Sequence, residues 1–295
     1  MMNDKIPIFR FAPSPNGELH LGHAFSALLS LRLAREVDGK MLLRIEDIDT
    51  DRCTPEFESQ MLRDLEWIGF EWDEEPLRQS EHFGEYREFL FRLEEKQLLY
   101  ASAMSRREIK QRVAELEGSG VAWPHDPDGS PIYPGSERET PATKKIPVAA
   151  VLGEQVIRLD TKQAISGLSR QLTWQETGSG PFGETGTIRA DPMAWGDVVL
   201  ARRDTPVSYH LACTVDDARH GVTHIVRGMD LFHSTSVHRL LQELLELPEP
   251  EYHHHRLVLD DQQKKLSKSD KDTSLSQLRQ SGVGKSQILS MIGMD

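Results

Sequence analysis

Two short segments far apart in the chain carry residue types that suit phosphate chemistry. Residues 13–23 read Pro-Ser-Pro-Asn-Gly-Glu-Leu-His-Leu-Gly-His, and residues 265–269 read Lys-Leu-Ser-Lys-Ser. In the first segment His20 and His23 are three residues apart, so on the first turn of a helix they share a face. In the second segment Lys268 offers a cation for a leaving pyrophosphate. Together the two segments predict an enzyme that activates a carboxylic acid with ATP.

The first segment is expected to form a turn that lets a nucleotide approach the backbone closely. Pro13 restricts the turn by fixing φ, while Gly17 and Gly22 remove side chains from the approach. The helix N-terminus that follows favours a phosphate, and imidazole N–H groups can stabilise charge that develops on an α-phosphate. The predicted catalytic residues are His20, His23 and Lys268. The predicted ATP-binding residues are Pro13, Gly17, His20, Gly22, His23, Lys265, Ser267 and Lys268.

The elements around the first segment predict a parallel sheet. Residues 6–12 read as a strand, apolar residues recur at helical steps over 21–34, and residues 41–45 read as a second strand. Strand, helix and strand in this order form a βαβ unit, which brings the two strands together in parallel with a right-handed crossover. Ligands bind beyond the carboxyl ends of such strands. Both residues 13–23 and the acidic run at 46–49 follow such an end.

The predicted secondary structure of the remaining chain changes twice. Residues 54–99 look largely helical, whereas the many glycines and prolines between about 101 and 190 predict a loop-rich insertion. Strand patterns resume at 197–200 and 222–226. The chain is therefore expected to be an α/β protein with a Rossmann-like parallel-sheet catalytic domain. The expected division is a catalytic domain at 1–100 and 191–245, an inserted smaller domain at 101–190, and a short helical C-terminal region at 246–295 with the lysine loop.

Bulk properties exclude several classes of protein. With 295 residues, 38% hydrophobic and 28% charged, the composition is that of an ordinary globular protein. A net charge of −12 argues against a nonspecific nucleic-acid binder, although it allows RNA binding through a local basic face. Neither a signal peptide nor a transmembrane helix is expected, and the two cysteines form no disulfide or metal motif. A cytoplasmic location is the natural expectation.

The two phosphate-binding segments are similar to the signature sequences of class I aminoacyl-tRNA synthetases. More narrowly, residues 10–17, 44–49 and 226–228 resemble the glutamyl branch of that family, and the blocks occur in the family's order. The resemblance spans roughly residues 9–269. It implies a ligase that uses ATP, with magnesium on the phosphates. It also implies a glutamate pocket made of Arg10, Phe11, Ala12, Pro13, Ser14, Glu46, Tyr209 and Arg227.

These residue types suit glutamate as a substrate. Arginine presents a planar fork that matches a carboxylate, so Arg10 and Arg227 are candidates for the acidic groups. Glu46 can pair with the substrate ammonium group, and the Tyr209 hydroxyl can donate to a carboxylate oxygen. Without the resemblance, ordinary ion pairs would explain the arginines and core packing would explain the tyrosine.

The length of the chain after the lysine loop bears on the acceptor. Only residues 270–295 follow, with one short helix expected at about 285–292, so no anticodon-binding domain is expected. This plan resembles the glutamyl-queuosine tRNA(Asp) synthetases, which activate glutamate without tRNA and transfer it to the queuosine base in the anticodon loop of tRNA(Asp). Two alternatives stay open. One is a short glutamyl-tRNA synthetase that charges a tRNA 3′ end, and the other is a catalytically silent, synthetase-like binding module.

Metal sites other than magnesium are not expected. Several family members hold zinc in the insertion with Cys-x-Cys and a later Tyr-x3-Cys, and the matching positions here are Ala101, Ala103, Tyr133 and Glu137. One tyrosine and one carboxylate are too few for structural zinc, and His125 is expected to be solvated. The three histidines at 253–255 would alternate between faces of an extended segment, which does not favour a metal site.

The tRNA-contacting residues cannot be assigned from the sequence. A basic set in the insertion could form a phosphate-contacting face or serve solubility alone. Its members are Arg106, Arg107, Lys110, Arg112, Lys144 and Lys145. A monomer is the family expectation.

Overall fold

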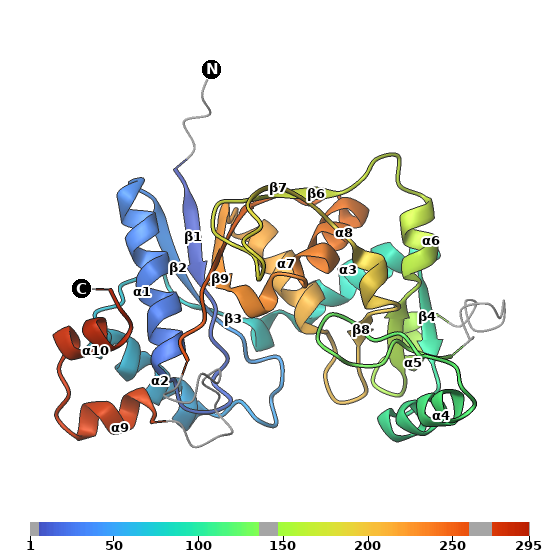
Figure 1. Cartoon of the computed structure of the whole chain (residues 1–295), viewed down its shortest axis with the longest axis horizontal. Helices are drawn as coiled ribbons and strands as arrows, with labels where there is room; N and C mark the ends of the chain where they lie inside the picture. The colour runs from blue at the N-terminus through green and yellow to red at the C-terminus, as the bar shows by residue number, and fades with distance from the viewer. Residues whose placement is uncertain (1–5, 136–146, 260–272, 295) are drawn as a thin grey trace.

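A computed structural model describes residues 6–135, 147–259 and 273–294 (Figure 1). Its largest element is a seven-stranded sheet in the order β3-β2-β1-β9-β10-β6-β7, and a second sheet has the order β4-β5-β8. Helices cover the large sheet and join it to the smaller one. The predicted α/β class and the parallel catalytic sheet are confirmed.

The predicted βαβ unit forms the N-terminal part of the large sheet. Strand β1 (Ile8–Phe11) runs parallel to β2 (Lys40–Ile45), and α1 (Leu21–Glu36) crosses between them. Helix α1 buries Ala24, Phe25 and Leu28, which match the helical spacing of its apolar residues. The segment at 13–23 therefore leaves the carboxyl end of β1 and leads into α1, as the sequence predicts.

Two later strands complete the ligand-binding edge. Strand β9 (His224–Gly228) pairs in parallel with both β1 and β10 (Glu251–His255). The short strand β3 (Leu77–Arg78) extends the sheet beyond β2. Because β1, β2, β9 and β10 are parallel, their carboxyl ends meet at one edge of the sheet.

Strand pairing crosses the expected domain boundaries. Within residues 101–190, β6 (Thr173–Glu176) and β7 (Gly186–Arg189) form a hairpin, and β6 pairs with β10 in the large sheet. Conversely, β8 (Val199–Ala201) pairs with β5 (Val156–Leu159), which pairs with β4 (Leu99–Ser102). Strands of three or four residues give little periodic signal, so their partners could not be assigned from the sequence. The division into domains stays a prediction.

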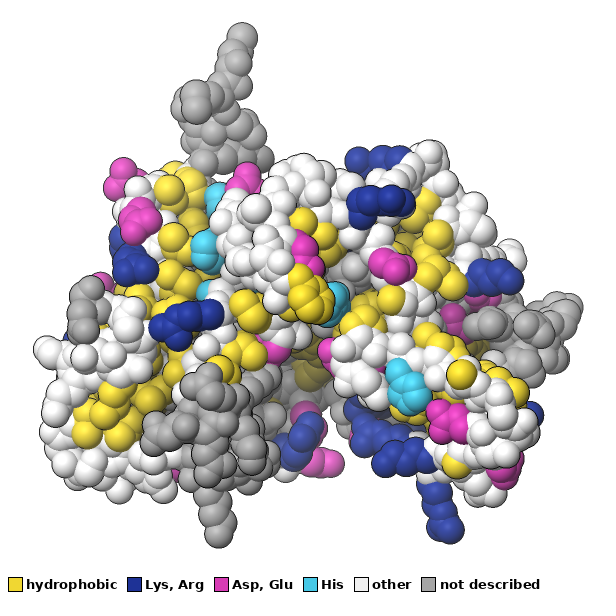
Figure 2. Space-filling view, in the orientation of Figure 1, with side chains coloured by type: hydrophobic (Ala, Val, Ile, Leu, Met, Phe, Trp, Pro, Cys, Tyr) yellow, Lys and Arg dark blue, Asp and Glu magenta, His cyan; other side chains and the backbone are white. Residues whose placement is uncertain are grey.

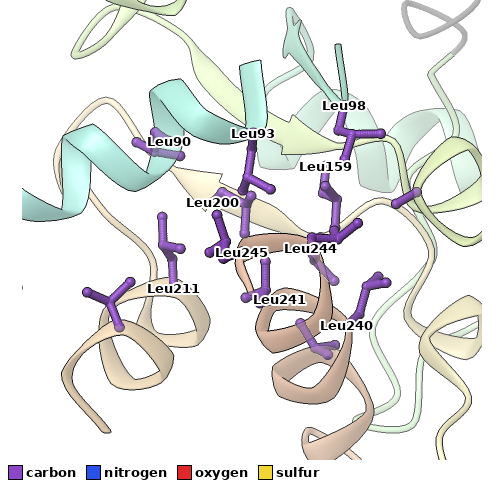
Figure 3. Packing of buried hydrophobic residues seen from close by; sticks show 14 of the residues in the cluster. Leu90, Leu93, Leu98, Leu159, Leu200, Leu211, Leu240, Leu241, Leu244 and Leu245 are labelled. Carbon is purple, nitrogen blue, oxygen red and sulfur yellow. The ribbon is translucent and has the colours of Figure 1, made fainter. Parts of the chain in front are cut away.

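A continuous leucine-rich core joins the small sheet to the helices behind the large one. Leucines from α3 (Phe83–Glu95), α7 (Tyr209–Arg219) and α8 (Thr235–Leu245) face Leu159 and Leu200 of the small sheet (Figure 3). The same cluster includes Ile225 and Tyr252 of the large sheet. The two sheets therefore share one hydrophobic core, which stabilises their relative position.

The C-terminal residues pack against the N-terminal part of the chain (Figure 1). The amide of Leu275 donates to the carbonyl of Leu19 at 2.8 Å, and Arg279 pairs with the buried Asp64 at 3.0 Å. Helix α9 (Leu275–Gln280) thereby lies against α2 (Pro55–Ile68), and α10 (Lys285–Met291) follows it. The other helices are α4 (Arg106–Gly118), α5 (Val148–Val151) and α6 (Thr161–Ser166). Within the described ranges, no helix is long and apolar enough to cross a membrane.

Candidate active site

A cavity of about 470 Å³ lies at the carboxyl ends of β1 and β9 and at the start of α1. Its lining includes all eight predicted glutamate-binding residues, Arg10, Phe11, Ala12, Pro13, Ser14, Glu46, Tyr209 and Arg227. It also includes His20, Gly22 and His23. Among the predicted ATP-binding residues that the structure describes, only Gly17 is not part of the lining. Lys265, Ser267 and Lys268 lie outside the described residues.

His20 and His23 cap helix α1 through reciprocal hydrogen bonds. His20 Nδ1 accepts from the Gly22 amide at 3.1 Å, and His23 Nδ1 accepts from the His20 amide at 3.2 Å. The two ring centroids are 3.9 Å apart. A ring nitrogen that accepts an N–H carries no proton, so each ring must hold its proton on Nε2. The capping geometry therefore makes both rings hydrogen-bond donors through Nε2, at a helix N-terminus.

Gly22 gives the His20 ring its room. A Cβ at this position would lie 2.9 Å from Cε1 and 3.0 Å from Nδ1 of His20. We expect Gly22→Ala to shift the ring and to lower the rate of ATP-dependent acid activation by about 10- to 100-fold. The free energy of unfolding should change by less than about 1 kcal/mol, because alanine is the better helix former.

A matched control exists at the same position of another helix. Gly84 is the second residue of α3, and a Cβ there meets no atom within 4 Å. Gly84→Ala should leave the rate of ATP-dependent acid activation unchanged, measured as the exchange of labelled pyrophosphate into ATP. Normal exchange by the Gly22→Ala variant would show that the position of the His20 ring does not limit activation.

Buried ion pairs fix the floor of the cavity. Arg10 Nε contacts Asp217 Oδ1 at 2.9 Å, and Arg44 bridges Asp217 at 2.6 Å and Glu46 at 2.9 Å. Arg10 and Glu46 are only 5% and 8% exposed. Gln79 donates to the neighbouring Asp216 at 2.7 Å. The side chains that face the cavity are thus held by partners behind them.

This network sets the charge of its carboxyl groups. Burial opposes ionisation of Asp217, but Arg10 and Arg44 outweigh it and lower the pKa of this carboxyl. For Glu46 burial is the larger effect, and it raises the pKa despite Arg44 and Arg10. An incoming ammonium group beside Glu46 would favour its ionised form, which suits the predicted role in binding the substrate amine.

Arg227 is held by neutral partners. Its guanidinium donates to His254 Nε2 at 3.1 Å, to the Thr235 hydroxyl at 2.7 Å and to the Leu231 carbonyl at 3.2 Å. It also lies 3.2 Å from His238 Nδ1. Burial lowers the pKa of His254 to about 4 and that of His238 well below its ordinary value. Among the described residues, none of these hydrogen-bond partners is a carboxylate, so a substrate carboxylate would supply the opposite charge.

Glu176 of β6 supports this arrangement from behind. Its carboxylate lies 2.5 Å from His254 Nδ1 and accepts the amides of His254 and Gly178. Burial opposes its ionisation, but these hydrogen bonds outweigh it and lower the pKa of Glu176. With Nδ1 protonated toward Glu176, His254 presents the lone pair of Nε2 to Arg227. His253 is half-buried and contacts Thr177, whereas both His254 and His255 are buried, so the predicted alternation of the three histidines stays a prediction.

Tyr209 begins helix α7 and lines the cavity. Burial raises the pKa of its hydroxyl, so this group stays protonated and able to donate. The adjacent His210 lies 3.1 Å from His238, and burial lowers the pKa of His210 to about 4. The two imidazoles thus add no positive charge next to Arg227.

Several residues of the site were missed by the sequence reasoning. Asp217, His238, His254 and Glu176 hold the predicted arginines, and Asp230, Leu257 and Val258 line the cavity. The sequence offered one signal, because two adjacent aspartates at 216–217 follow an apolar helical run. Both aspartates are buried in the structure, and charged residues are rarely buried unless they are paired.

The insertion positions named for zinc are placed only in part. Ala101 lies in β4, and the Tyr133 ring is covered by the Arg158 guanidinium at 3.9 Å, whereas Glu137 lies outside the described residues. His125 lies 3.0 Å from the Trp123 carbonyl. In the described part of the chain no group of three or more His, Cys, Asp or Glu residues could hold a metal. The expectation of no zinc stays a prediction.

The fold and the cavity together define a class I synthetase catalytic domain. Residues 8–294 match the family described as tRNA synthetases class I (E and Q), catalytic domain. The chain therefore belongs to the class I tRNA synthetase family of the glutamate and glutamine branch.

Individual relatives and structures agree with this assignment. The chain is 45% identical to a glutamyl-Q tRNA(Asp) synthetase of Rhodobacter capsulatus, over 97% of this chain and all of the relative. It is 32% identical to a glutamate–tRNA ligase of Prochlorococcus marinus, over 92% of this chain but 55% of that enzyme. A glutamate tRNA ligase structure from Elizabethkingia meningosepticum in complex with its amino acid has a TM-score of 0.69 at 30% identity, over 90% of this chain and 52% of that one. The chain thus spans about half the length of the glutamate–tRNA ligases that it matches.

Proposed function

We propose that the protein activates L-glutamate with ATP in the absence of tRNA and then transfers the glutamyl group to the queuosine base in the anticodon loop of tRNA(Asp). The observation that carries the activation step is the single cavity that joins Arg227, held by neutral groups, to the paired donors His20 and His23. The choice of acceptor is supported by similarity over the full length of the glutamyl-Q tRNA(Asp) synthetase of Rhodobacter capsulatus.

The proposed reaction has two steps. An α-carboxylate oxygen of glutamate attacks the α-phosphorus of ATP, the bond to the β-phosphate oxygen breaks, and pyrophosphate leaves. A hydroxyl of the queuosine cyclopentenediol then attacks the acyl carbon, AMP leaves, and the hydroxyl proton passes to solvent. No protein nucleophile is needed, because positioning and charge stabilisation lower the barriers.

The residues that carry the proposed chemistry have separate roles. His20 and His23 donate to the α-phosphate, Arg10 and Arg227 receive the carboxylates, Glu46 receives the ammonium group, and Tyr209 donates to a carboxylate oxygen. Lys268 neutralises charge on the leaving pyrophosphate, and Lys265 and Ser267 contribute to ATP binding. These roles are supported by the flanking residues: Val258 lines the cavity, and Ser274 pairs with His20 in an isolated β-bridge.

Magnesium is proposed as a partner of the nucleotide. In the described part of the chain no cluster of three acidic or histidine side chains stands ready for a metal, so the triphosphate oxygens would supply most of the ligands. When bound, the ion would neutralise phosphate charge. We further propose that the protein is a cytoplasmic monomer and that it binds no zinc. Its domains are proposed to divide as given above.

The decisive test compares activation with transfer. Glutamate-dependent exchange of labelled pyrophosphate into ATP should occur without tRNA, and its absence would favour a catalytically silent module. Labelled glutamate should then be accepted by tRNA(Asp) that carries queuosine, also after removal of the 3′-terminal adenosine. Equal acceptance by tRNA lacking queuosine, or acceptance lost with the adenosine, would instead indicate an enzyme that charges the 3′ end.

A further inference from the structure

The last two helices, α9 and α10, pack against α2 and share a core with one wall of the cavity. We call them the C-terminal helix pair. Leu275, Ile288 and Ile292 are buried in one hydrophobic cluster with Leu19 and with Val258 of the cavity lining. Further hydrophobic side chains lie at the surface over this region (Figure 2). The roles assigned above use no side chain of the pair.

The turn that leads to His20 has no regular structure of its own. Residues 12–19 belong to no helix or strand. At the end of this turn the Leu275 amide donates to the Leu19 carbonyl at 2.8 Å, and Ser274 forms the isolated β-bridge with His20. The backbone that precedes the His20 side chain is therefore attached to the start of α9.

Helix α2 contacts both the turn and the helix pair. Gln60 donates to Glu18 of the turn at 2.5 Å, and Arg279 of α9 donates to Asp64 at 3.0 Å. Gln60 and Asp64 are four residues apart, so they lie on one face of α2. The turn, α2 and α9 are thus each in contact with the other two, next to His20.

The ion pair between Asp64 and Arg279 is sensitive to substitution because Asp64 is 0% exposed. Burial raises the pKa of the Asp64 carboxyl and Glu18 adds to this effect, while Arg279 and Arg63 oppose it. Without Arg279 the buried carboxyl group would lose its ion-pair partner. The contact between α9 and α2 would then weaken.

Arg256 anchors the other end of the helix pair. It donates to the Ile292 carbonyl at 2.5 Å, and its guanidinium lies 4.5 Å from the centre of the Phe25 ring of α1. Arg256 directly follows His255, which lines the cavity and contacts Phe25. Both ends of the pair are therefore tied to segments that bound the cavity, unlike the loosely held end of many chains.

We propose that the C-terminal helix pair positions His20 for the activation step, with Arg279 and Asp64 as the positioning residues. Their ion pair holds α9 on α2, and α9 in turn holds the backbone at Leu19. The inference rests on the proposed function, in which His20 donates to the α-phosphate. The buried arginines of the glutamate pocket have partners of their own, so the helix pair should affect the rate of activation and not the affinity for glutamate.

Arg279→Gln tests this role, because Arg279 is partly exposed and does not line the cavity. The variant should lower the kcat of pyrophosphate exchange about 10- to 100-fold, since small displacements of a catalytic group have effects of this size. The KM for glutamate should stay within about twofold. Arg279→Lys keeps the charge and should recover most of the rate. In an Asp64→Asn background, Arg279→Gln should cause little further loss, because the two residues act together.

A matched control removes an ion pair at the opposite end of α1. Arg35 pairs with Asp73 at 3.0 Å, and neither residue lines the cavity. Arg35→Gln should leave the kcat of exchange unchanged, and denaturant unfolding would record the stability of both variants. An equal fall in kcat for Arg35→Gln and Arg279→Gln would overturn the positioning role.

NMR spectra of the His20 imidazole give a readout that does not depend on catalysis. Arg279→Gln should shift the ring nitrogen resonances of His20, whereas Arg35→Gln should not. Unchanged resonances together with a normal kcat for Arg279→Gln would overturn the inference and leave the proposed function intact. Absence of exchange by the unaltered protein would instead contradict the proposed function, and the resonances would still test the contact.

Discussion

Replacing Arg227 by alanine is expected to weaken glutamate activation by about 2–5 kcal/mol, or roughly thirtyfold to several thousandfold in kcat/KM for glutamate. Arg227 is 5% exposed, lines the cavity and makes its hydrogen bonds to histidines, a hydroxyl and a carbonyl. Its loss would leave a substrate carboxylate buried without a cation. The exchange assay with varied glutamate concentration gives the measurement.

Two further variants separate binding from folding. Arg227→Lys keeps the charge but loses the planar fork, so an intermediate loss is expected. Arg92 also donates to a backbone carbonyl, that of Leu245 at 2.6 Å, and it does not line the cavity. Arg92→Ala should leave the KM for glutamate unchanged. If Arg227→Ala folded normally and also kept the wild-type KM, the arginine would not bind the substrate.

Replacing His20 by asparagine or His23 by glutamine should lower the kcat of activation by about 100- to 1000-fold, with little loss of stability. Asparagine is a good N-cap and glutamine suits the third position of a capping box, so both variants can keep the hydrogen bonds now made by Nδ1. Neither variant retains the imidazole Nε2 donor. The pair therefore removes the proposed phosphate contact while preserving the helix cap.

The alanine variants provide the comparison. His20→Ala should lose both the donor and the cap, which costs about 0.5–2 kcal/mol of stability in addition to the lower rate. Denaturant unfolding and single-turnover adenylate formation would measure the two effects separately. A normal rate for His20→Asn would assign this histidine to helix capping alone.

Local patterns allowed one side of the site to be predicted from the sequence. Strand β1, the turn and helix α1 are contiguous, so the spacing of His20 and His23 was enough to place both rings at the start of the helix. The structure differs in one detail, because His20 is the N-cap residue that precedes the helix and only His23 lies in its first turn. The arginines were found by their type and by the resemblance to a family. Their supports could not be found this way, because Arg10 meets Asp217 and His254 meets Glu176 across long stretches of sequence. Such contacts depend on the order of strands, which short strands do not encode locally.

The pairing of β6 with β10 limits how far the chain can be treated as separable modules. Glu176 lies on β6 and orients His254, which in turn holds Arg227. A version of the chain shortened by excising residues 101–190 would therefore lose the carboxylate that orients this histidine, even if the nucleotide-binding turn survived. Binding of the amino acid therefore depends on the insertion. Substitutions at Glu176 on β6 and at His254 on β10 are expected to be tolerated together and not one at a time.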